Sequence, residues 1–314
     1  MLGPRSAAHW WTIAPNLLGR LRPPPVADRP WSTIIDDAQR PATIAGALAL
    51  PARSDPAHPA DLYLLVHGLG GTADSPYMLA AAAAVQARGH GSLRISLRGA
   101  GDSSPDFYHA GIGRDLSAVL ADPSLRDFGR VFIIGFSMGG HIALHNAWWA
   151  DRDPRIAAVI AVCSPLDLAA NIAAIDTPRV WLYRRHVLSG LETMYASIHG
   201  RRRRFESVRE WDQVVVVPRW GFDDVDHYWR TQSSGPRLVD TEVPVLFVGA
   251  EEDPMVPAHT LRPHLQHARG RRGDLVHAAW VRWGGHVGFP ASVDLGMAGP
   301  PGLMNQILSW CEKV

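Results

Sequence analysis

The chain has 314 residues, a length that fits either two average domains or one large α/β domain with an insertion. Hydrophobic residues make up 46% of the sequence and charged residues 19%, which argues against a disordered chain. The net charge of +1 gives no electrostatic reason to expect a nucleic-acid partner. The two cysteines are too few to indicate a disulfide framework or a zinc site, and Cys163, in an apolar run, reads as a small buried hydrophobe.

The sequence shows neither a membrane span nor a signal peptide. No run approaches the roughly 18 apolar residues that cross a bilayer. The first residues lack the order of basic and then apolar residues that is typical of a secreted protein. We therefore expect a cytoplasmic protein, while an additional peripheral membrane contact and the oligomeric state are left open.

Residues 1–30 are rich in Pro, Trp and Arg, and we expect an arm that packs on the surface of the core. The side chains expected to hold this arm are apolar: Trp10, Trp11, Ile13, Leu17 and Leu18. Two strand-like runs follow at 31–36 and 43–50, and they predict an antiparallel hairpin at a sheet edge.

From residue 62 onward, short apolar runs alternate with helix-forming runs, which predicts an α/β fold with a mostly parallel sheet and helices on both faces. The expected strands are 62–67, 93–97, 131–134, 156–162, 243–248 and 275–283. The expected helices are 76–88, 114–120, 141–150, 259–268 and 303–314. The alternation lapses over 167–240, which we interpret as an inserted helical cap on a core made of 31–166 and 241–314.

A serine motif lies between the strand at 131–134 and the helix that follows it. Residues 135–139 read Gly-Phe-Ser-Met-Gly and fit the G-x-S-x-G elbow, in which a serine lies on a very tight strand-to-helix turn. Larger side chains two positions to either side would collide, so glycine is expected there. Ser137 is the predicted nucleophile, although a plain linking turn has the same composition.

An orienting acid is expected after the strand at 243–248, because the acid and the base follow such a serine in chain order. Three acids compete there: Glu251, Glu252 and Asp253. Pro254 favours extended backbone at Asp253, so we predict Asp253, with Glu252 as the second choice and Glu251 as a solvated side chain.

The general base is expected beyond the last strand. His286 lies there in a glycine-rich run, 284–288, which lets the ring reach back to Ser137. The remaining histidines include His141 and His145, one helical turn apart, for which we expect a structural role and no metal because no acidic partner lies between them.

An oxyanion hole needs two backbone donors. We expect one to be the N–H of Met138, directly after the serine, at a helix N-terminus that stabilises negative charge. The other candidate is the N–H of Leu69 in the glycine-rich loop 67–71, for which a plain glycine turn is the alternative. The arginines at 201–204 are expected on a solvated face of the cap, with contact to anionic lipid head groups as the alternative.

On these residues the chain resembles the YheT-like branch of the α/β-hydrolases, a branch that also includes mammalian membrane-associated lipid hydrolases. The resemblance covers nearly the whole length and rests on the motifs at 11–15, 67–71, 74–78, 97–99, 108–111, 115–116, 135–140, 164–168, 222–224, 228–230, 233–234, 253–254 and 284–289. The chain departs from the branch at His141, where asparagine is expected, and through 179–217, which matches little. The resemblance implies carboxylic-ester hydrolysis and no cofactor.

We therefore predict a serine esterase with the triad Ser137, Asp253 and His286 and an acyl-enzyme intermediate. The expected substrate is a small-molecule ester or lipid, and the tryptophan-rich cap suggests a hydrophobic acyl group. Acyl transfer and the cleavage of thioesters or amides use the same triad and stay open. A non-catalytic, lipid-binding peripheral membrane protein is the alternative from another class.

Overall fold

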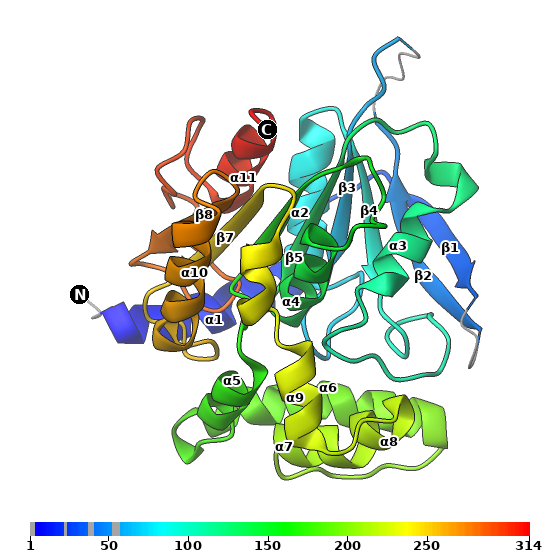
Figure 1. Ribbon diagram of the computed structural model, residues 1–314, viewed down its shortest axis with the longest axis vertical. Coiled ribbons are helices and arrows are strands. Elements are labelled where there is room, and N and C mark those ends of the chain that lie inside the picture. Colours follow the sequence, from blue (N-terminus) through cyan, green and yellow to red (C-terminus); the bar gives the residue numbers. More distant parts are fainter. Residues whose placement is uncertain (1–3, 22–23, 37–40, 52–56) are drawn as a thin grey trace.

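The computed structural model describes residues 4–21, 24–36, 41–51 and 57–314. Within these ranges, a single eight-stranded sheet has the strand order β1-β2-β4-β3-β5-β6-β7-β8 (Figure 1). The strands are β1 (Arg29–Ile35), β2 (Ala42–Ala49), β3 (Leu62–Val66), β4 (Gly91–Ser96), β5 (Val131–Phe136), β6 (Ile156–Val162), β7 (Val245–Ala250) and β8 (Val276–Val281). β2 runs antiparallel to both of its neighbours, whereas β3 to β8 are parallel, so the α/β fold and the antiparallel edge hairpin are confirmed.

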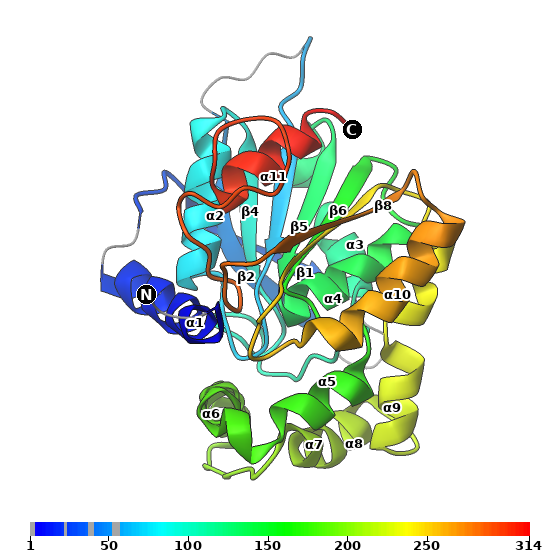
Figure 2. The same cartoon turned by 90° about the vertical axis from the view of Figure 1, so that its left-hand side faces the viewer.

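Helices cover both faces of the sheet, as Figure 2 shows. The helices are α1 (Pro4–Leu21), α2 (Pro76–Ala87), α3 (Arg114–Leu120), α4 (Met138–Leu144), α5 (Leu168–Ile175), α6 (Trp181–His199), α7 (Val208–Trp211), α8 (Val217–Trp220), α9 (Val225–Gln232), α10 (Ala258–Arg271) and α11 (Leu303–Cys311). α2 and α11 share one apolar core with the sheet, and α3, α4 and α10 share the other. The central strands β3, β4, β5 and β7 are consequently buried at every position, which explains the apolar runs of β3, β5 and β7; β4 also buries the polar side chains of Ser92, Arg94 and Ser96.

Most elements differ from their expected bounds by a few residues, and two of these differences have identifiable reasons. β7 begins two residues later than expected, directly after Pro244, which has no N–H to donate to a neighbouring strand. The helix after the elbow begins at Met138, because the carbonyl of Ser137 accepts from the N–H of Gly140. It then gives way to a 3-10 turn at His145–Ala147, where the buried side chain of Asn146 donates to the carbonyl of Gly113 at 3.2 Å.

Residues 168–240 form a layer of helices beside the carboxyl ends of the parallel strands, below the sheet in Figure 1. This helical layer contains α5 to α9 together with short turns and one π-helix, Asp212–Val216. No strand occurs in the layer, which is described throughout. Across the described ranges, none of the helices combines the length and apolar character that crossing a bilayer requires.

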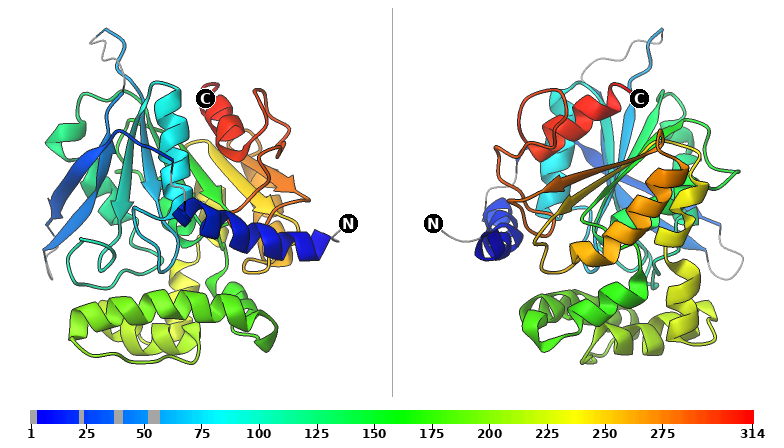
Figure 3. Two further views of the ribbon diagram at one scale, coloured as in Figure 1. Left: turned by 180° about the vertical axis from the view of Figure 1, so that it is seen from behind. Right: turned by 60° about the vertical axis from the view of Figure 1, so that its left-hand side comes forward.

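Much of the N-terminal segment expected as an arm is a helix, α1. α1 lies between α2 and the helical layer, roughly alongside α6 (Figure 3). Small residues form its buried face: Ala7, Ala8, Thr12 and Ala14. The expectation that Trp10, Ile13 and Leu18 hold the segment is wrong, since these side chains are 57%, 38% and 62% exposed. Trp11 is half-buried, and the side chain of Leu17 lies outside the described set.

Candidate active site

Ser137 lies on a strained turn between β5 and α4. Its backbone adopts φ 53° and ψ −124°, a region that side chains rarely occupy. A Cβ atom added to Gly135 would lie 2.3 Å from the carbonyl oxygen of Gly139, and one added to Gly139 would lie 2.3 Å from the carbonyl oxygen of Val66. The collision expected from the G-x-S-x-G spacing is therefore present on both sides of the serine.

The structure brings three predicted side chains into one chain of hydrogen bonds. Nε2 of His286 lies 2.8 Å from Oγ of Ser137, and Nδ1 of His286 lies 2.9 Å from Oδ2 of Asp253. Because an ionised carboxylate only accepts hydrogen bonds, Asp253 favours the tautomer with its proton on Nδ1. Nε2 is then left to accept the proton of the Ser137 hydroxyl.

Asp253 is the carboxylate at this position, and the competing acids are engaged elsewhere or more open. Its side chain is buried, and Oδ1 accepts the backbone N–H groups of Met255 at 2.8 Å and Val256 at 3.0 Å. These bonds leave Oδ2 directed at His286. Glu251 pairs with Arg262 near the surface, and Glu252 is only partly buried.

The loop that carries the second expected oxyanion donor is held by two tyrosines. The N–H of Gly68 donates to the hydroxyl of Tyr77, and the N–H of Gly70 donates to the hydroxyl of Tyr108, both at 3.0 Å. The N–H of Leu69, between them, has no acceptor among the described residues. It is therefore available to a substrate oxygen, as an oxyanion donor has to be.

This loop lies directly against the elbow. A Cβ atom added to Gly68 would lie 3.0 Å from Cβ of Ser137. The N–H of Met138, the first residue of α4, has no carbonyl one turn earlier in its own helix. The two backbone donors expected from the sequence thus come from segments that meet at the serine.

A buried histidine fixes the base of the same loop. Nε2 of His67 accepts the N–H of Leu97 at 3.0 Å, so Nδ1 carries the proton and donates to the carbonyl of Gly68 at 2.7 Å. Burial lowers the pKa of His67 to about 4, which keeps the ring neutral near pH 7. Sequence reasoning assigned no role to His67, Tyr77 or Tyr108, although all three lie in motifs that carry the family resemblance.

The thiol of Cys163 lies close to two members of the triad. Sγ of Cys163, one carboxylate oxygen of Asp253 and one ring nitrogen of His286 lie within 4.8 Å of one another. Burial, and next the charge of Asp253, raise the pKa of the Cys163 thiol well above its ordinary value, so the thiol stays protonated. A metal requires the thiolate, and Nδ1 of His286 already faces the carboxylate, so these donors suit a hydrogen-bonded triad better than a metal. The expectation that Cys163 is merely a small hydrophobe missed this contact.

His141 fits the structural role expected of it. Its two ring nitrogens lie 2.8 Å from the carbonyl oxygens of Pro165 and Gln232. These contacts join α4 to the helical layer. Burial lowers the pKa of both His141 and His145, although the two carbonyl contacts of His141 act in the opposite direction.

Two adjoining cavities open between the sheet and the helical layer. They share Leu69, Met138, Ile172 and Val208 as walls. The larger, of about 400 Å³, contains Ser137 and His286, and its other walls are mostly apolar: Pro165, Asn171, Ile175, Val187, Met255 and Val256. The smaller, of about 330 Å³, has a more polar lining that includes Tyr108, His109, Asp212 and Tyr228.

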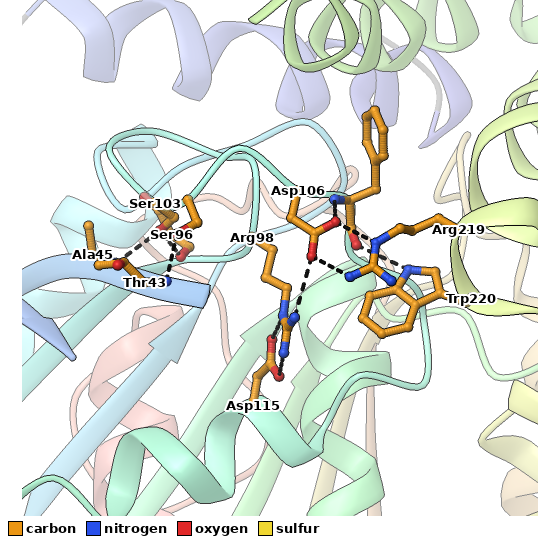
Figure 4. A network of polar contacts seen from close by, with 11 residues as sticks. Thr43, Ala45, Ser96, Arg98, Ser103, Asp106, Asp115, Arg219 and Trp220 are labelled. Atoms are coloured by element: carbon orange, nitrogen blue, oxygen red, sulfur yellow. Dashed lines mark hydrogen bonds and ion pairs between the residues drawn. The ribbon is translucent and has the colours of Figure 1, made fainter. Parts of the chain in front are cut away.

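Ion pairs connect the helical layer to the sheet beside the smaller cavity (Figure 4). Asp106 accepts two hydrogen bonds from Arg219 of α8 and faces Arg98, which in turn binds Asp115 of α3. Burial disfavours the ionised form of Asp106, but hydrogen bonds from Arg219 and from the N–H of Phe107 outweigh it and hold the pKa below its ordinary value. The segment that contains Tyr108 is thereby fixed at both the core and the helical layer.

The chain has relatives among proteins that are named as esterases and lipases. Residues 63–292 match the alpha/beta hydrolase family. YheT of Escherichia coli (strain K12) is 26% identical over 72% of this chain, phospholipase ABHD3 of Homo sapiens 24% over 72%, and the monoacylglycerol lipase of Saccharomyces cerevisiae 24% over 65%. The matched regions span 69%, 58% and 49% of these relatives, so the chain corresponds to between half and about two thirds of their length.

Solved structures show the same fold at lower sequence identity. An esterase from Pyrococcus furiosus superposes with a TM-score of 0.56 at 15% identity, over 83% of this chain and 85% of that chain. An acylaminoacyl peptidase from Pyrococcus horikoshii gives a TM-score of 0.54 at 14% identity, over 86% of this chain and 39% of that chain. With its eight-stranded sheet and the matched span of residues, the chain belongs to the alpha/beta hydrolase family, in which it is YheT-like.

Proposed function

We propose that the protein is a serine hydrolase that cleaves carboxylic esters, with Ser137 as nucleophile, His286 as general base and Asp253 as the group that orients the base. The observation that carries the proposal is the hydrogen-bond chain from Ser137 through His286 to Asp253, with bonds of 2.8 and 2.9 Å at the wall of a cavity. A serine hydroxyl is a weak nucleophile unless such a base is within hydrogen-bond reach.

The reaction follows from this geometry. Oγ of Ser137 attacks the ester carbonyl carbon while its proton passes to Nε2 of His286, and the carbonyl oxygen becomes an oxyanion held by the N–H groups of Leu69 and Met138. Collapse of this intermediate breaks the bond to the alcohol, which leaves with the proton from Nε2. A water molecule then gives a proton to Nε2 and attacks the acyl-enzyme, and the acid is released as the proton returns to Ser137.

The lining of the larger cavity supports a hydrophobic acyl group. Its walls include Ile172 and Ile175 of α5 and Val187 of α6, so the helical layer supplies much of the apolar surface next to the serine. We therefore propose that this layer acts as the cap that selects the acyl chain. Two relatives are named a phospholipase and a monoacylglycerol lipase, and by analogy we propose esters of the lipid type as substrates.

Covalent labelling tests the nucleophile. A fluorophosphonate probe is expected to label the wild type and the control variant Ser309→Ala, in which a buried serine on α11 is removed. Ser137→Ala is expected to lose labelling and ester hydrolysis together while keeping the wild-type circular dichroism spectrum. Equal labelling of Ser137→Ala and the wild type would show that another residue is the nucleophile.

A series of p-nitrophenyl esters tests the acyl pocket. We expect kcat/KM to rise from acetate toward medium-length acyl chains, since each buried methylene contributes about 0.8 kcal/mol. Ile172→Trp should reduce kcat/KM for the longer esters by about tenfold more than for acetate, because it fills the cavity. Ile198→Trp, on α6 but away from both cavities, is the matched control. A strict preference for acetate in the wild type would contradict the pocket assignment.

A further inference from the structure

The loop that carries His286 has to hold the imidazole between two partners without support from a strand. It follows β8 and turns sharply: the N–H of Gly285 donates to the carbonyl of Gly288 at 2.8 Å, and Val287 adopts φ 53°. Such backbone persists only where surrounding structure holds it in place.

α1 supplies a direct contact to the backbone of His286. The N–H of His286 donates to Oγ1 of Thr12 at 2.9 Å, and the hydroxyl of Thr12 donates in turn to the carbonyl of Ala8 at 2.8 Å. Thr12 is 7% exposed, so water does not compete freely for these bonds. The hydroxyl therefore acts at once as acceptor for His286 and as donor to its own helix, which fixes its orientation.

The helix and the loop are also packed backbone to backbone. A Cβ atom added to Gly285 would lie 2.3 Å from the carbonyl oxygen of Ala8 and 2.4 Å from the backbone nitrogen of Thr12. Only glycine leaves room for α1 to approach this closely. The hydrogen bond at Thr12 is thus part of a tight contact rather than an isolated interaction.

The same helix contacts the helical layer. The ring of His9 stacks on Tyr183 of α6, with ring centres 5.6 Å apart and planes inclined by 6°, and Nδ1 of His9 lies 2.5 Å from the tyrosine hydroxyl. Within one turn, α1 therefore touches the loop of the general base and a helix of the layer that walls the cavity. Contacts with the His286 loop on one side and with α6 on the other therefore fix the position of Thr12.

We propose that Thr12 is a positioning residue for the general base: its hydroxyl holds the backbone of His286 so that the imidazole reaches Ser137 and Asp253 at once. The inference rests on the proposed function. It assigns to α1, a segment outside the matched family region 63–292, a part in the active site. Thr12 acts through His286 and has no part in the bond-making steps.

Two substitutions distinguish the effect of the Thr12 hydroxyl from the effect of its side-chain shape. Thr12→Val keeps the branched shape but leaves the N–H of His286 without an acceptor, and a displacement of about 1 Å at a reacting group lowers rates up to ~100-fold. We expect kcat to fall at least about tenfold, with KM within about twofold of the wild type. Thr12→Ser, which restores the hydroxyl, should recover kcat to within about threefold.

The matched control is Thr241→Val. Thr241 is a fully buried threonine whose hydroxyl donates to the carbonyl of Val243 at 3.0 Å, and it precedes the amino end of β7, whereas the triad residues follow the carboxyl ends of their strands. It should lower the melting temperature about as much as Thr12→Val while leaving kcat within about twofold of the wild type. A merely structural role for Thr12 predicts that both variants lose activity in proportion to their unfolded fractions.

Two further readouts are specific to the base. The pH dependence of kcat/KM should shift on its acidic limb in Thr12→Val and not in Thr241→Val, because the imidazole loses its fixed alignment with Asp253. In NMR spectra, hydrogen exchange of the His286 amide should accelerate in Thr12→Val and return to the wild-type rate in Thr12→Ser. Unchanged exchange, or a folded Thr12→Val with wild-type kcat, would overturn the inference.

Failure of this inference is distinguishable from failure of the proposed function. If the wild type neither hydrolyses esters nor reacts with the fluorophosphonate probe, the esterase proposal fails, while the amide exchange of His286 still reports whether Thr12 holds the loop. If the wild type is active and the amide of His286 exchanges equally in all three Thr12 forms, the esterase proposal stands and the positioning role is wrong. Should Thr12→Val not fold, the comparison of Thr12→Ser with Thr12→Ala applies the same criteria.

Discussion

Arg219 of α8 binds Asp106 through two hydrogen bonds, of 2.6 and 2.8 Å, at the boundary between the helical layer and the sheet. The carboxylate is 2% exposed and the arginine side chain 18% exposed. A similar pair, Arg209 with Asp226, has hydrogen bonds of 3.1 and 3.0 Å but lies in solvent, with side chains 51% and 63% exposed. The two pairs share their chemistry and differ in burial.

This difference predicts unequal effects on stability. Arg219→Ala leaves Asp106 buried with Arg98 as its remaining cation, and we expect a loss of at least about 2 kcal/mol in the free energy of unfolding. Arg209→Ala should cost less than about 1 kcal/mol, since exposed ion pairs contribute little. Both arginines also lie over a tryptophan ring, so the loss of this cation–π contact largely cancels when the two variants are compared. Urea unfolding of the two variants checks the prediction, which equal losses would contradict.

The assignment of the orienting acid predicts a contrast between neighbours. Asp253→Asn removes the charge that favours the Nδ1–H tautomer of His286 and stabilises the imidazolium, so kcat should fall by about 10³-fold or more. Glu252→Gln should leave kcat within about twofold of the wild type, because His286 binds Asp253 instead. Steady-state hydrolysis of a p-nitrophenyl ester by both variants measures this. A larger loss in Glu252→Gln than in Asp253→Asn would reverse the assignment.

The loop that carries the proposed oxyanion donor Leu69 should be sensitive to the loss of the Tyr108 hydroxyl. Tyr108→Phe leaves the N–H of Gly70 without its acceptor, so the neighbouring N–H of Leu69 is held less rigidly and kcat should fall about tenfold. Tyr195→Phe is the control, because the Tyr195 hydroxyl has no hydrogen-bond partner in the part of the chain that the structure describes. Fluorophosphonate labelling rates should follow kcat, and equal rates in the two variants would show that the Tyr108 hydroxyl does not hold the loop that carries Leu69.

Asp212 predicts a pH dependence of stability. Burial, only partly offset by a hydrogen bond from Trp229, raises the pKa of this carboxyl to about 7. The folded state therefore holds a proton that the unfolded state releases above about pH 4, and this contribution to stability is lost as the pH rises through 7. In the wild type the loss between about pH 5 and pH 8 should be about 3 kcal/mol.

Asp212→Asn isolates that contribution, because the amide oxygen still accepts from Trp229 but does not titrate. The variant should gain stability relative to the wild type between about pH 5 and pH 8, as measured by urea unfolding at each pH. The buried neutral histidines act in the opposite direction in both proteins, since the pKa of His67 is about 4 and that of His109 about 3. Comparing variant with wild type removes their contribution, and a constant difference across the pH range would contradict the raised pKa.

The sheet was predictable because its strands are covered on both faces. The run 131–134 is apolar at every position for that reason, so the strand can be predicted from these residues alone. The three triad side chains also follow a simple rule, since each follows the carboxyl end of a parallel strand and these ends lie at one edge. Local pattern and topology together were enough to select Ser137, Asp253 and His286 as neighbours.

Other features depend on contacts that no local pattern marks. Arg219 and Asp106 are 113 positions apart, and the sequence neighbours of neither residue distinguish it from a charge that lies in solvent. α1 was missed because the tryptophans and prolines of the first 30 residues drew attention away from its small residues, such as Ala8 and Thr12, which form its buried face. The elbow helix was expected to continue to residue 150, but the side chain of Asn146 finds a tertiary hydrogen bond where the helix ends.

The hydrogen bond between Thr12 and His286 joins positions 274 apart, and β8, which precedes His286, is the last strand of the chain and lies at the sheet edge in the described structure. During synthesis the serine turn leaves the ribosome with the central strands, whereas the imidazole follows 149 positions later, after β8, and then meets a helix made before the strands of the sheet. A nascent chain thus has a formed elbow without a proton acceptor. Under the proposed function, the appearance of hydrolysis in a cell-free translation reaction would time the docking of the His286 loop against α1.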